Sequence, residues 1–465
     1  MKQRTKHLFQ LSVTLLGVFA VLLSSSNHKQ NTNNLSSFAF GIGSRFIAQI
    51  EPMGNLPDLI EYRIAHRLKK RLSRIQLASP SIRLLADAVS KRQELLKRSV
   101  SISLNSSDGL INGIWEVSLS ANPAWIKGEF ALDSAGFAVD EKTVLSYLET
   151  NYYPGAYPPK DITITKTISA GTGSAMRIET DGIAKAGYSA DLKHDSRAIA
   201  EALNYGYPSL SIPLEWREGY VSYDNGEEIL NLTLLSQGKS NFKGSDKRRI
   251  LNVTKALNQH INNVIVPPGE KFSFNSTLDG PVSERNGWNM AKVILYGEQL
   301  VLQPGGGICQ ASTTVYRAIV RAGLPVIDRR AHSLYVTYYK KYGVGLDATI
   351  YPGSQDLAFL NDTDYPIVIQ AFDTEEKDAI VNFYGVPDGR KVALEGPFFK
   401  STAPQTIKDK WRAVKGNEIV WTQKVEYTDG TIKDNIIVSS YKTLPSSLPN
   451  EFIAQEEKFE LLGLR

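Results

Sequence analysis

The only cysteine of the 465-residue chain, Cys309, follows three consecutive glycines at positions 305–307. Glycine lets the backbone take positive φ and approach other groups closely. Apolar residues at helical spacing follow, and Gly323 and Pro325 end that pattern, so we expect a helix that begins at or near Cys309. The free N–H groups and the dipole of a helix start favour the thiolate and lower the pKa of a thiol. These are the parts of a nucleophile with an oxyanion hole.

We therefore assign this segment to an oxyanion hole and substrate loop. Its members are Gly305, Gly306, Gly307, Gln310, Ser312 and Thr313. The alternative is that Cys309 is a small buried apolar side chain, which is how free cysteines usually behave. The sequence neighbours of Cys309 alone do not decide between these two interpretations.

A histidine downstream could act as the base. Of the six histidines, only His260 and His332 lie in the cysteine-containing region. His332 follows the cysteine helix at a distance that suits a return strand, from which it would take the thiol proton and later protonate a leaving amine. Asp347, in a strand predicted at 347–350, would orient the imidazole; the alternative is a strand-end carboxylate. We expect His260 at the surface of an amphipathic helix.

No metal and no cofactor are predicted. One cysteine and scattered histidines lack the paired spacing of zinc ligands. No Gly-Lys-Ser/Thr sequence follows the glycines, as a phosphate-binding loop would require. The net charge of +5 is mild. It does not indicate a nucleic-acid partner, although it would suit an anionic cell surface.

The N-terminus predicts export. Lys2, Arg4 and Lys6 precede an apolar run at 8–23, which is typical of a secretory signal. The run is short for a membrane span, which needs about 20 residues, and whether it is cleaved or kept as a membrane anchor stays open. We expect an extracytoplasmic protein, either membrane-anchored or secreted to the cell envelope. A lone thiol cannot form an intramolecular disulfide, so in an exported protein its use in chemistry is favoured.

The chain is predicted to be an α+β protein of several domains, because helical and strand periodicities are both present. Its basic amphipathic helices either lie on a membrane or wall polymer or pack as a hairpin on the next domain. The predicted parts are a signal peptide or membrane anchor (1–30), a tether with the basic helices (31–112), a small α+β domain (113–216), the cysteine-containing α+β domain (230–388) and a β-rich module (389–465) with a hairpin turn at 428–431.

The residues from Gly305 to Tyr316 resemble the signature of the VanW family, which is named for a vancomycin-resistance accessory protein. Further blocks follow the family's order, and the resemblance covers roughly residues 235–384. Ala331 departs from the family, which often has proline before His-Ser, and this bears on where His332 lies. The domain at 113–216 more loosely resembles the peptidoglycan-binding domain that often precedes VanW, and the tail is faintly similar to a G5 module. The supporting blocks are 240–245, 268–275, 322–324, 332–333, 347–349 and 361–367.

The resemblance implies a cell-wall protein whose partners are peptidoglycan stem peptides. Some members are implicated as L,D-transpeptidases, in which a cysteine attacks a stem carbonyl, expels a terminal D-residue and passes the acyl group to an amine; water as acceptor would make a carboxypeptidase. The alternative is a non-catalytic peptidoglycan-binding or vancomycin-resistance accessory protein with an incidental thiol. Separation of Cys309 and His332 beyond hydrogen-bond reach would favour that alternative.

Overall fold

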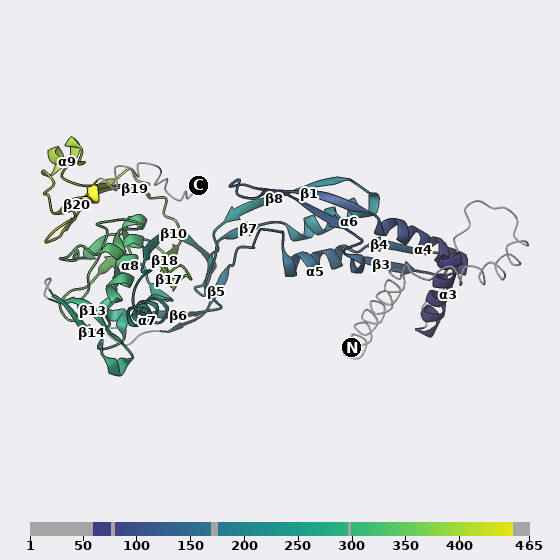
Figure 1. Ribbon diagram of the computed structural model, residues 1–465, viewed down its shortest axis with the longest axis horizontal. Coiled ribbons are helices and arrows are strands. Elements are labelled where there is room, and N and C mark those ends of the chain that lie inside the picture. Colours follow the sequence, from purple (N-terminus) through teal and green to yellow (C-terminus); the bar gives the residue numbers. More distant parts are fainter. Residues whose placement is uncertain (1–58, 76–79, 169–174, 296–298, 450–465) are drawn as a thin grey trace, which may run out of the picture. The chain divides into compact units, whose positions relative to one another are not determined.

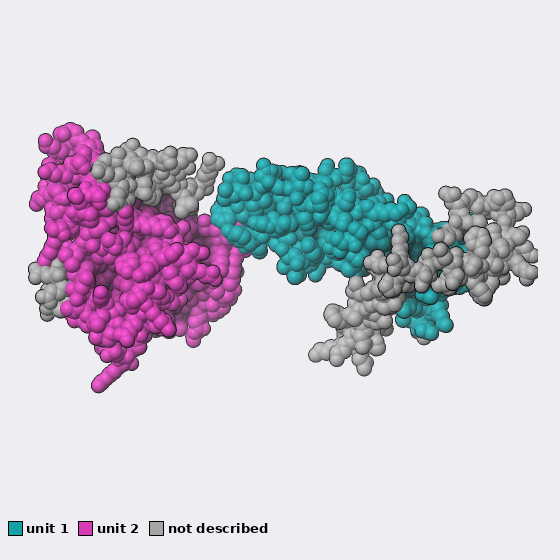
Figure 2. Space-filling model, in the orientation of Figure 1, with its two compact units in different colours: residues 1–158, 188–216 teal, residues 159–187, 217–465 magenta. Residues whose placement is uncertain are grey.

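The computed structural model describes residues 59–75, 80–168, 175–295 and 299–449. The predicted signal or anchor at 1–30 lies outside these residues, and within them no helix is both long and apolar enough to cross a membrane. The described part holds seven α-helices and many strands in several sheets, which confirms the α+β class (Figure 1). The chain divides into two compact units, which Figure 2 colours separately: residues 1–158 with 188–216, and residues 159–187 with 217–465.

The first unit begins with two helices, α3 (Leu59–Arg74) and α4 (Ile82–Leu96), that pack against each other. Their small core contains Ala65, Leu72 and Leu85. Partly buried residues of the hairpin formed by β3 (Ile126–Phe130) and β4 (Ala135–Val139) pack against that core. The two basic amphipathic helices thus form a hairpin that packs on the following domain.

The rest of the first unit is a four-stranded sheet with two helices. The strand order is β2 (Asn112–Ser118), β1 (Ser99–Ser106), β8 (Ser209–Arg217) and β7 (Gly187–Ser189), and the helices are α5 (Glu141–Asn151) and α6 (Leu192–Tyr205), with a short 3-10 turn at Pro123–Trp125. Asp140 caps α5. Asp191 caps α6, and buried Asp195 accepts a 2.6 Å hydrogen bond from the Tyr153 hydroxyl.

The second unit is built on a closed barrel of seven strands. Its order is β10 (Ile229–Asn241), β18 (Asp378–Gly385), β17 (Ile367–Asp373), β11 (Val264–Val266), β6 (Arg177–Thr180), β5 (Ile162–Ile168) and β9 (Val221–Asp224). Alternating apolar residues predicted β5 as a strand within the 113–216 domain. It instead pairs with β9 and β6 of the barrel, because alternation shows that a strand forms but not which strand it joins.

The cysteine-containing helix α8 (Ile308–Ala322) lies against β10 of this barrel (Figure 1). The approach is close at Gly238, where an added Cβ would lie 2.0 Å from the Thr314 carbonyl oxygen. Buried hydroxyls join the two elements, since Ser236 donates to the Ala318 carbonyl at 2.9 Å and Ser240 lies 2.6 Å from the Thr314 hydroxyl. The start of α8 is therefore fixed by the packing of the whole helix.

Shorter elements surround α8. Helix α7 is capped by Asp246, as predicted, and a π-helical turn continues it. Residues 347–350 do not form the predicted strand. They carry only an isolated bridge between Arg330 and Thr349, because the backbone of Ala348 forms hydrogen bonds with side chains of α8. The elements are α7 (Lys247–Lys255), the π-turn (Ala256–Ile261), the hairpin β13 (Met290–Leu295) and β14 (Gln299–Pro304), the sheet of β12 (Lys271–Ser273), β16 (Ala358–Leu360) and β15 (Val326–Asp328), and 3-10 turns at Asn275–Leu278, Glu284–Asn286 and Thr337–Tyr339.

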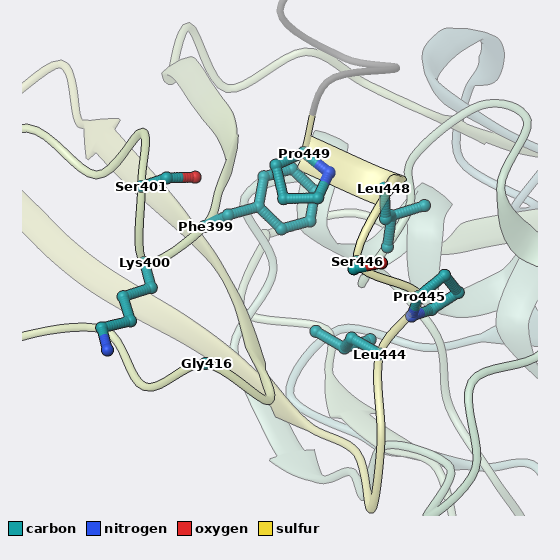
Figure 3. Close-up of a pocket in the computed structure, with 9 residues that line it drawn as sticks. All are labelled: Phe399, Lys400, Ser401, Gly416, Leu444, Pro445, Ser446, Leu448 and Pro449. Carbon is teal, nitrogen blue, oxygen red and sulfur yellow. The ribbon is translucent and has the colours of Figure 1, made fainter.

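The C-terminal module packs on the hydrophobic core that contains the buried side chains of α8. It consists of β19 (Lys391–Phe398), α9 (Gln405–Lys410), β20 (Glu418–Glu426) and β21 (Ile432–Ser440), and the predicted hairpin joins β20 to β21. The Trp421 indole donates to the Val344 carbonyl at 2.8 Å, and Ile419 would lie within 2.5 Å of a Cβ added to Gly345. A pocket of about 390 Å³ lies in this module beside Phe399 and Leu448 (Figure 3).

Candidate active site

Cys309 lies in the first turn of α8, directly after the glycine loop. Gly307 is the residue before the helix and has φ of 115°, which side chains other than hydrogen disfavour. Gly306 approaches β13 so closely that an added Cβ would lie 2.5 Å from the Ala291 carbonyl carbon. The glycines thus satisfy a backbone turn and a close approach. Two N–H groups of the first turn are already bonded, because the Ile308 N–H donates to the Gly305 carbonyl at 3.0 Å and the Gln310 N–H donates to the Gly307 carbonyl at 2.8 Å.

Asn252 of α7 anchors this loop, and the sequence analysis did not identify it. Its fully buried side-chain amide donates to the Gly306 carbonyl and to the Asn289 carbonyl, both at 2.9 Å. Its carbonyl oxygen accepts from the Asn289 N–H at 2.8 Å. One side chain therefore joins α7, the start of β13 and the glycine loop. No local pattern could reveal it, because Gly306 lies 54 residues away.

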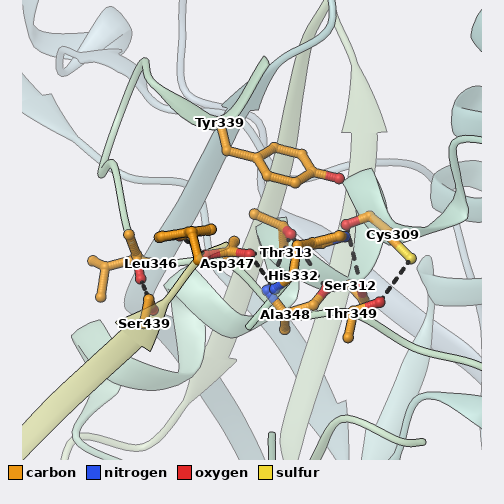
Figure 4. Close-up of polar contacts among 12 residues, drawn as sticks. Cys309, Ser312, Thr313, His332, Tyr339, Leu346, Asp347, Ala348, Thr349 and Ser439 are labelled. Atoms are coloured by element: carbon orange, nitrogen blue, oxygen red, sulfur yellow. Dashed lines mark hydrogen bonds and ion pairs between the residues drawn. The ribbon is translucent and has the colours of Figure 1, made fainter. Parts of the chain in front are cut away.

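The structure brings Cys309, His332 and Asp347 together (Figure 4). The His332 side chain and the Cys309 thiol are close enough that each shifts the pKa of the other. His332 Nδ1 lies 2.6 Å from Asp347 Oδ2, and the His332 backbone N–H donates to the same oxygen at 2.8 Å. Imidazole and carboxylate are thus joined by hydrogen bonds, with the thiol in electrostatic contact with the imidazole.

The electrostatics of this group favour a thiolate–imidazolium pair. Burial alone lowers the pKa of His332, but hydrogen bonds to Asp347 and Cys309 outweigh it and raise this pKa to about 9. Burial alone raises the pKa of Cys309, but the hydrogen bond and charge of His332 outweigh it, and the net shift is downward. Burial also raises the pKa of Asp347, yet the bond to His332 holds it well below the usual range. The carboxylate stays ionised and keeps the imidazole charged.

Tyr441, directly after β21, also binds Asp347, and no sequence signal marked it. Its hydroxyl donates to Asp347 Oδ1, the oxygen that His332 does not use. The next residue donates its backbone N–H to the Ser333 carbonyl at 2.8 Å. Arg329 completes the surroundings: its guanidinium lies 3.9 Å from Asp347 Oδ1 and donates to the Val438 carbonyl at 2.9 Å. The C-terminal module therefore holds both the histidine loop and the aspartate.

Replacing Tyr441 by phenylalanine is expected to weaken this support. A buried carboxylate oxygen would lose a hydrogen-bond donor, and bonds to charged groups contribute about 1.5–3 kcal/mol. We expect the free energy of unfolding, measured by denaturant titration, to fall by that amount. Tyr335→Phe is the matched control, because the Tyr335 ring contacts Tyr441 but its buried hydroxyl has no hydrogen-bond partner. Equal effects of the two changes would contradict the role of Tyr441.

The side chains of Gln310, Ser312 and Thr313, predicted to belong to the substrate loop, are fully buried in scaffold contacts. Ser312 Oγ donates to the Ala348 carbonyl at 2.7 Å, and Thr313 Oγ1 accepts from the Ala348 N–H at 3.2 Å. Gln310 Nε2 donates to Ser240 Oγ at 2.7 Å. These contacts fix α8 to β10 and to the residue next to Asp347, so the side chains position the site.

Two further side chains border the thiol and the imidazole. The Thr349 hydroxyl lies 3.7 Å from Cys309 Sγ (Figure 4). The buried Tyr339 ring lies against the His332 imidazole, with centroids 5.1 Å apart. Both residues limit the positions that the thiol and the imidazole can take. Cys309 as a residue is only partly buried.

The prediction for His260 is wrong, because its side chain is buried and only 8% of the residue is exposed. The π-helical turn directs the imidazole inward, where Nδ1 lies 3.0 Å from the Thr277 carbonyl and the ring stacks on Trp288. Burial lowers its pKa. His260 is thus a buried residue that supports the fold. No cluster of potential metal ligands occurs within the described ranges.

A thiol at a helix start, electrostatically coupled to a histidine that a buried aspartate orients, is the arrangement of a nucleophile with its base. Residues 248–384 match the family model described as VanW like protein, and this region of the chain is a VanW-like domain. The resemblance inferred from the cysteine segment is confirmed. The matched residues include neither the 113–216 region nor the C-terminal module.

A curated relative is the uncharacterized protein YoaR of Bacillus subtilis (strain 168), which is 38% identical over 137 residues. The match covers 30% of this chain and 43% of the relative, so the chain spans less than half of that relative's length. No solved structure matches the chain. The contacts within the site are therefore the basis for its proposed function.

Proposed function

We propose that the protein is a cysteine acyltransferase of the L,D-transpeptidase type that acts on peptidoglycan stem peptides. The observation that carries the proposal is the grouping of Cys309, at the start of α8, with His332, which is hydrogen-bonded to Asp347 and shifts the pKa of the thiol downward. Such a grouping activates a thiol toward a carbonyl and returns a proton to the leaving group. The VanW-like domain supports peptidoglycan as the target, because the family's name links it to vancomycin resistance.

The reaction follows from these groups. The Cys309 thiolate attacks the carbonyl carbon of the scissile amide, and the positive dipole end at the start of α8 favours the oxyanion that forms. The carbon–nitrogen bond breaks as the His332 imidazolium protonates the leaving amine, which leaves a thioester. An acceptor amine then attacks the thioester, His332 takes its proton, and the thiolate departs. Asp347 keeps the imidazole oriented through both steps.

The proposal includes a location. Stem peptides lie outside the cytoplasmic membrane, and the basic and apolar N-terminus has the pattern of an export signal. The protein would act in the cell envelope, tethered to the membrane by its N-terminus or released from it. A reporter fused to the C-terminus that is active only in the cytoplasm would contradict this location.

The test is incubation of the full chain with a stem tetrapeptide, followed by chromatography of the products. Release of the terminal D-residue together with a cross-linked dimer indicates transpeptidation. Release with only the shortened peptide indicates that water is the acceptor. Tight binding without any release would show that the site binds peptide and does not catalyse, and the proposal would then be wrong.

A further inference from the structure

Arg249, on α7, carries a charge that no acidic side chain balances. Within the described residues no carboxylate lies at ion-pair distance from its guanidinium, whereas Arg329 faces Asp347 and Arg390 pairs with Asp362 at 2.9 Å. The partners of Arg249 are neutral: Nε donates to Ser245 Oγ at 3.2 Å and Nη2 donates to Gln310 Oε1 at 2.9 Å. Its guanidinium also lies 4.7 Å from the centre of the Tyr338 ring.

These contacts place the charge beside the nucleophile. Gln310 directly follows Cys309 in α8, and a Cβ added to Gly307 would lie 3.1 Å from Arg249 Cγ, so Arg249 contacts the chain on both sides of the thiol. The guanidinium therefore lies near the start of α8 that carries the thiol.

The positive potential around this position favours an anion beyond the Cys309 thiolate, whose charge His332 already balances. The start of α8 already has a positive dipole end, and a positive side chain next to it raises that potential. The contacts to Ser245 and Gln310 use two of the five N–H donors of a guanidinium. The stack on Tyr338 holds the planar group in one orientation. The remaining donors form the fork that matches a carboxylate.

We infer that Arg249 binds the terminal carboxylate of the donor peptide, and so selects donors whose leaving residue ends in a free carboxylate. The identity of the peptide in this inference rests on the proposed function. In a donor, that carboxylate is separated from the scissile carbonyl by one residue. Arg249 contacts Gln310, the residue next to the thiol, and Gly307 of the glycine loop. An internal stem position or an amidated end presents no such charge.

The experiment measures binding, so that it does not depend on turnover. In a Cys309→Ala background, calorimetry compares a stem tetrapeptide with its C-terminal amide. The free acid is expected to bind roughly 10- to 100-fold more tightly, the range for hydrogen bonds to a charged group. Arg249→Gln should weaken the free acid by that factor, leave the amide unchanged and so remove the preference. Arg249→Lys should restore part of it, because it keeps the charge but not the fork.

Arg248→Gln is the matched control, because Arg248 is the exposed neighbour on α7 and the preference should persist. Equal weakening of acid and amide by Arg249→Gln would show that Arg249 only supports the loop through Gln310, and would overturn the inference. The absence of any preference in the parent would overturn it too. Failure of the proposed function has another signature: the preference is present, but protein with Cys309 intact releases no D-residue.

Discussion

Cys309→Ala is expected to abolish release of the terminal D-residue from stem peptides, because no other thiol exists in the chain to form the thioester. The fold should survive, since Cys309 is only partly buried and alanine favours a helix. We expect the free energy of unfolding to change by about 1 kcal/mol. Product chromatography and thermal unfolding of the same preparation measure both quantities.

Cys309→Ser is the matched control for this loss. Serine keeps the size and the hydrogen bonding of the side chain, but its hydroxyl is not ionised beside an imidazole of this pKa. We expect it to be as inactive as Cys309→Ala while still binding peptide. If either variant kept the parent's rate of release, the thiol would be a structural group, and the chemistry would have to lie elsewhere.

His332→Gln is expected to slow acylation by about 10² to 10⁴, the usual contribution of general acid–base catalysis. Without the imidazolium, the thiol keeps its burial but loses the charge that lowers its pKa. The parent should react with iodoacetamide rapidly down to mildly acidic pH, whereas the variant should react rapidly only in alkaline solution. Time courses of alkylation, quenched at intervals and repeated across a series of pH values, measure this difference.

The sign of the pH dependence follows from His332. Its pKa in the folded protein is about 9, above the ordinary value, so the imidazolium is present at lower pH and is lost as the pH rises through about 9. Turnover should decline over the same interval, because the leaving amine then lacks its acid. His194→Gln serves as control, since the His194 side chain is exposed in the first unit. A parent thiol that alkylates only after denaturation would rule out the ion pair.

Local patterns predicted the part of the site that depends on short stretches of sequence. The glycines, the helix spacing after Cys309 and the Gly323 stop predict a helix that the structure places at Ile308–Ala322. The hairpin of β20 and β21 followed from its turn residues at 428–431 in the same way. His332 and Asp347 were selected by residue type, and the structure places them side by side.

The rest of the site depends on contacts between distant segments, which no local pattern encodes. Tyr441 is 94 residues from Asp347, and Asn252 is 54 residues from Gly306. The barrel likewise recruits β5 and β6 from a stretch whose other strands pair in the first unit. His260 was misjudged because the π-helical turn changes which face of the helix is buried. Packing, rather than composition, decides each of these cases.

Intact-protein mass spectrometry after brief incubation with a stem tetrapeptide tests the central claim most directly. The account predicts a covalent adduct equal to the tetrapeptide without its terminal residue. It also predicts that digestion places the adduct on the peptide containing Cys309 and that an added amine acceptor removes it. If the protein binds the tetrapeptide but shows no adduct at any time, or carries it on a residue other than Cys309, the account is contradicted.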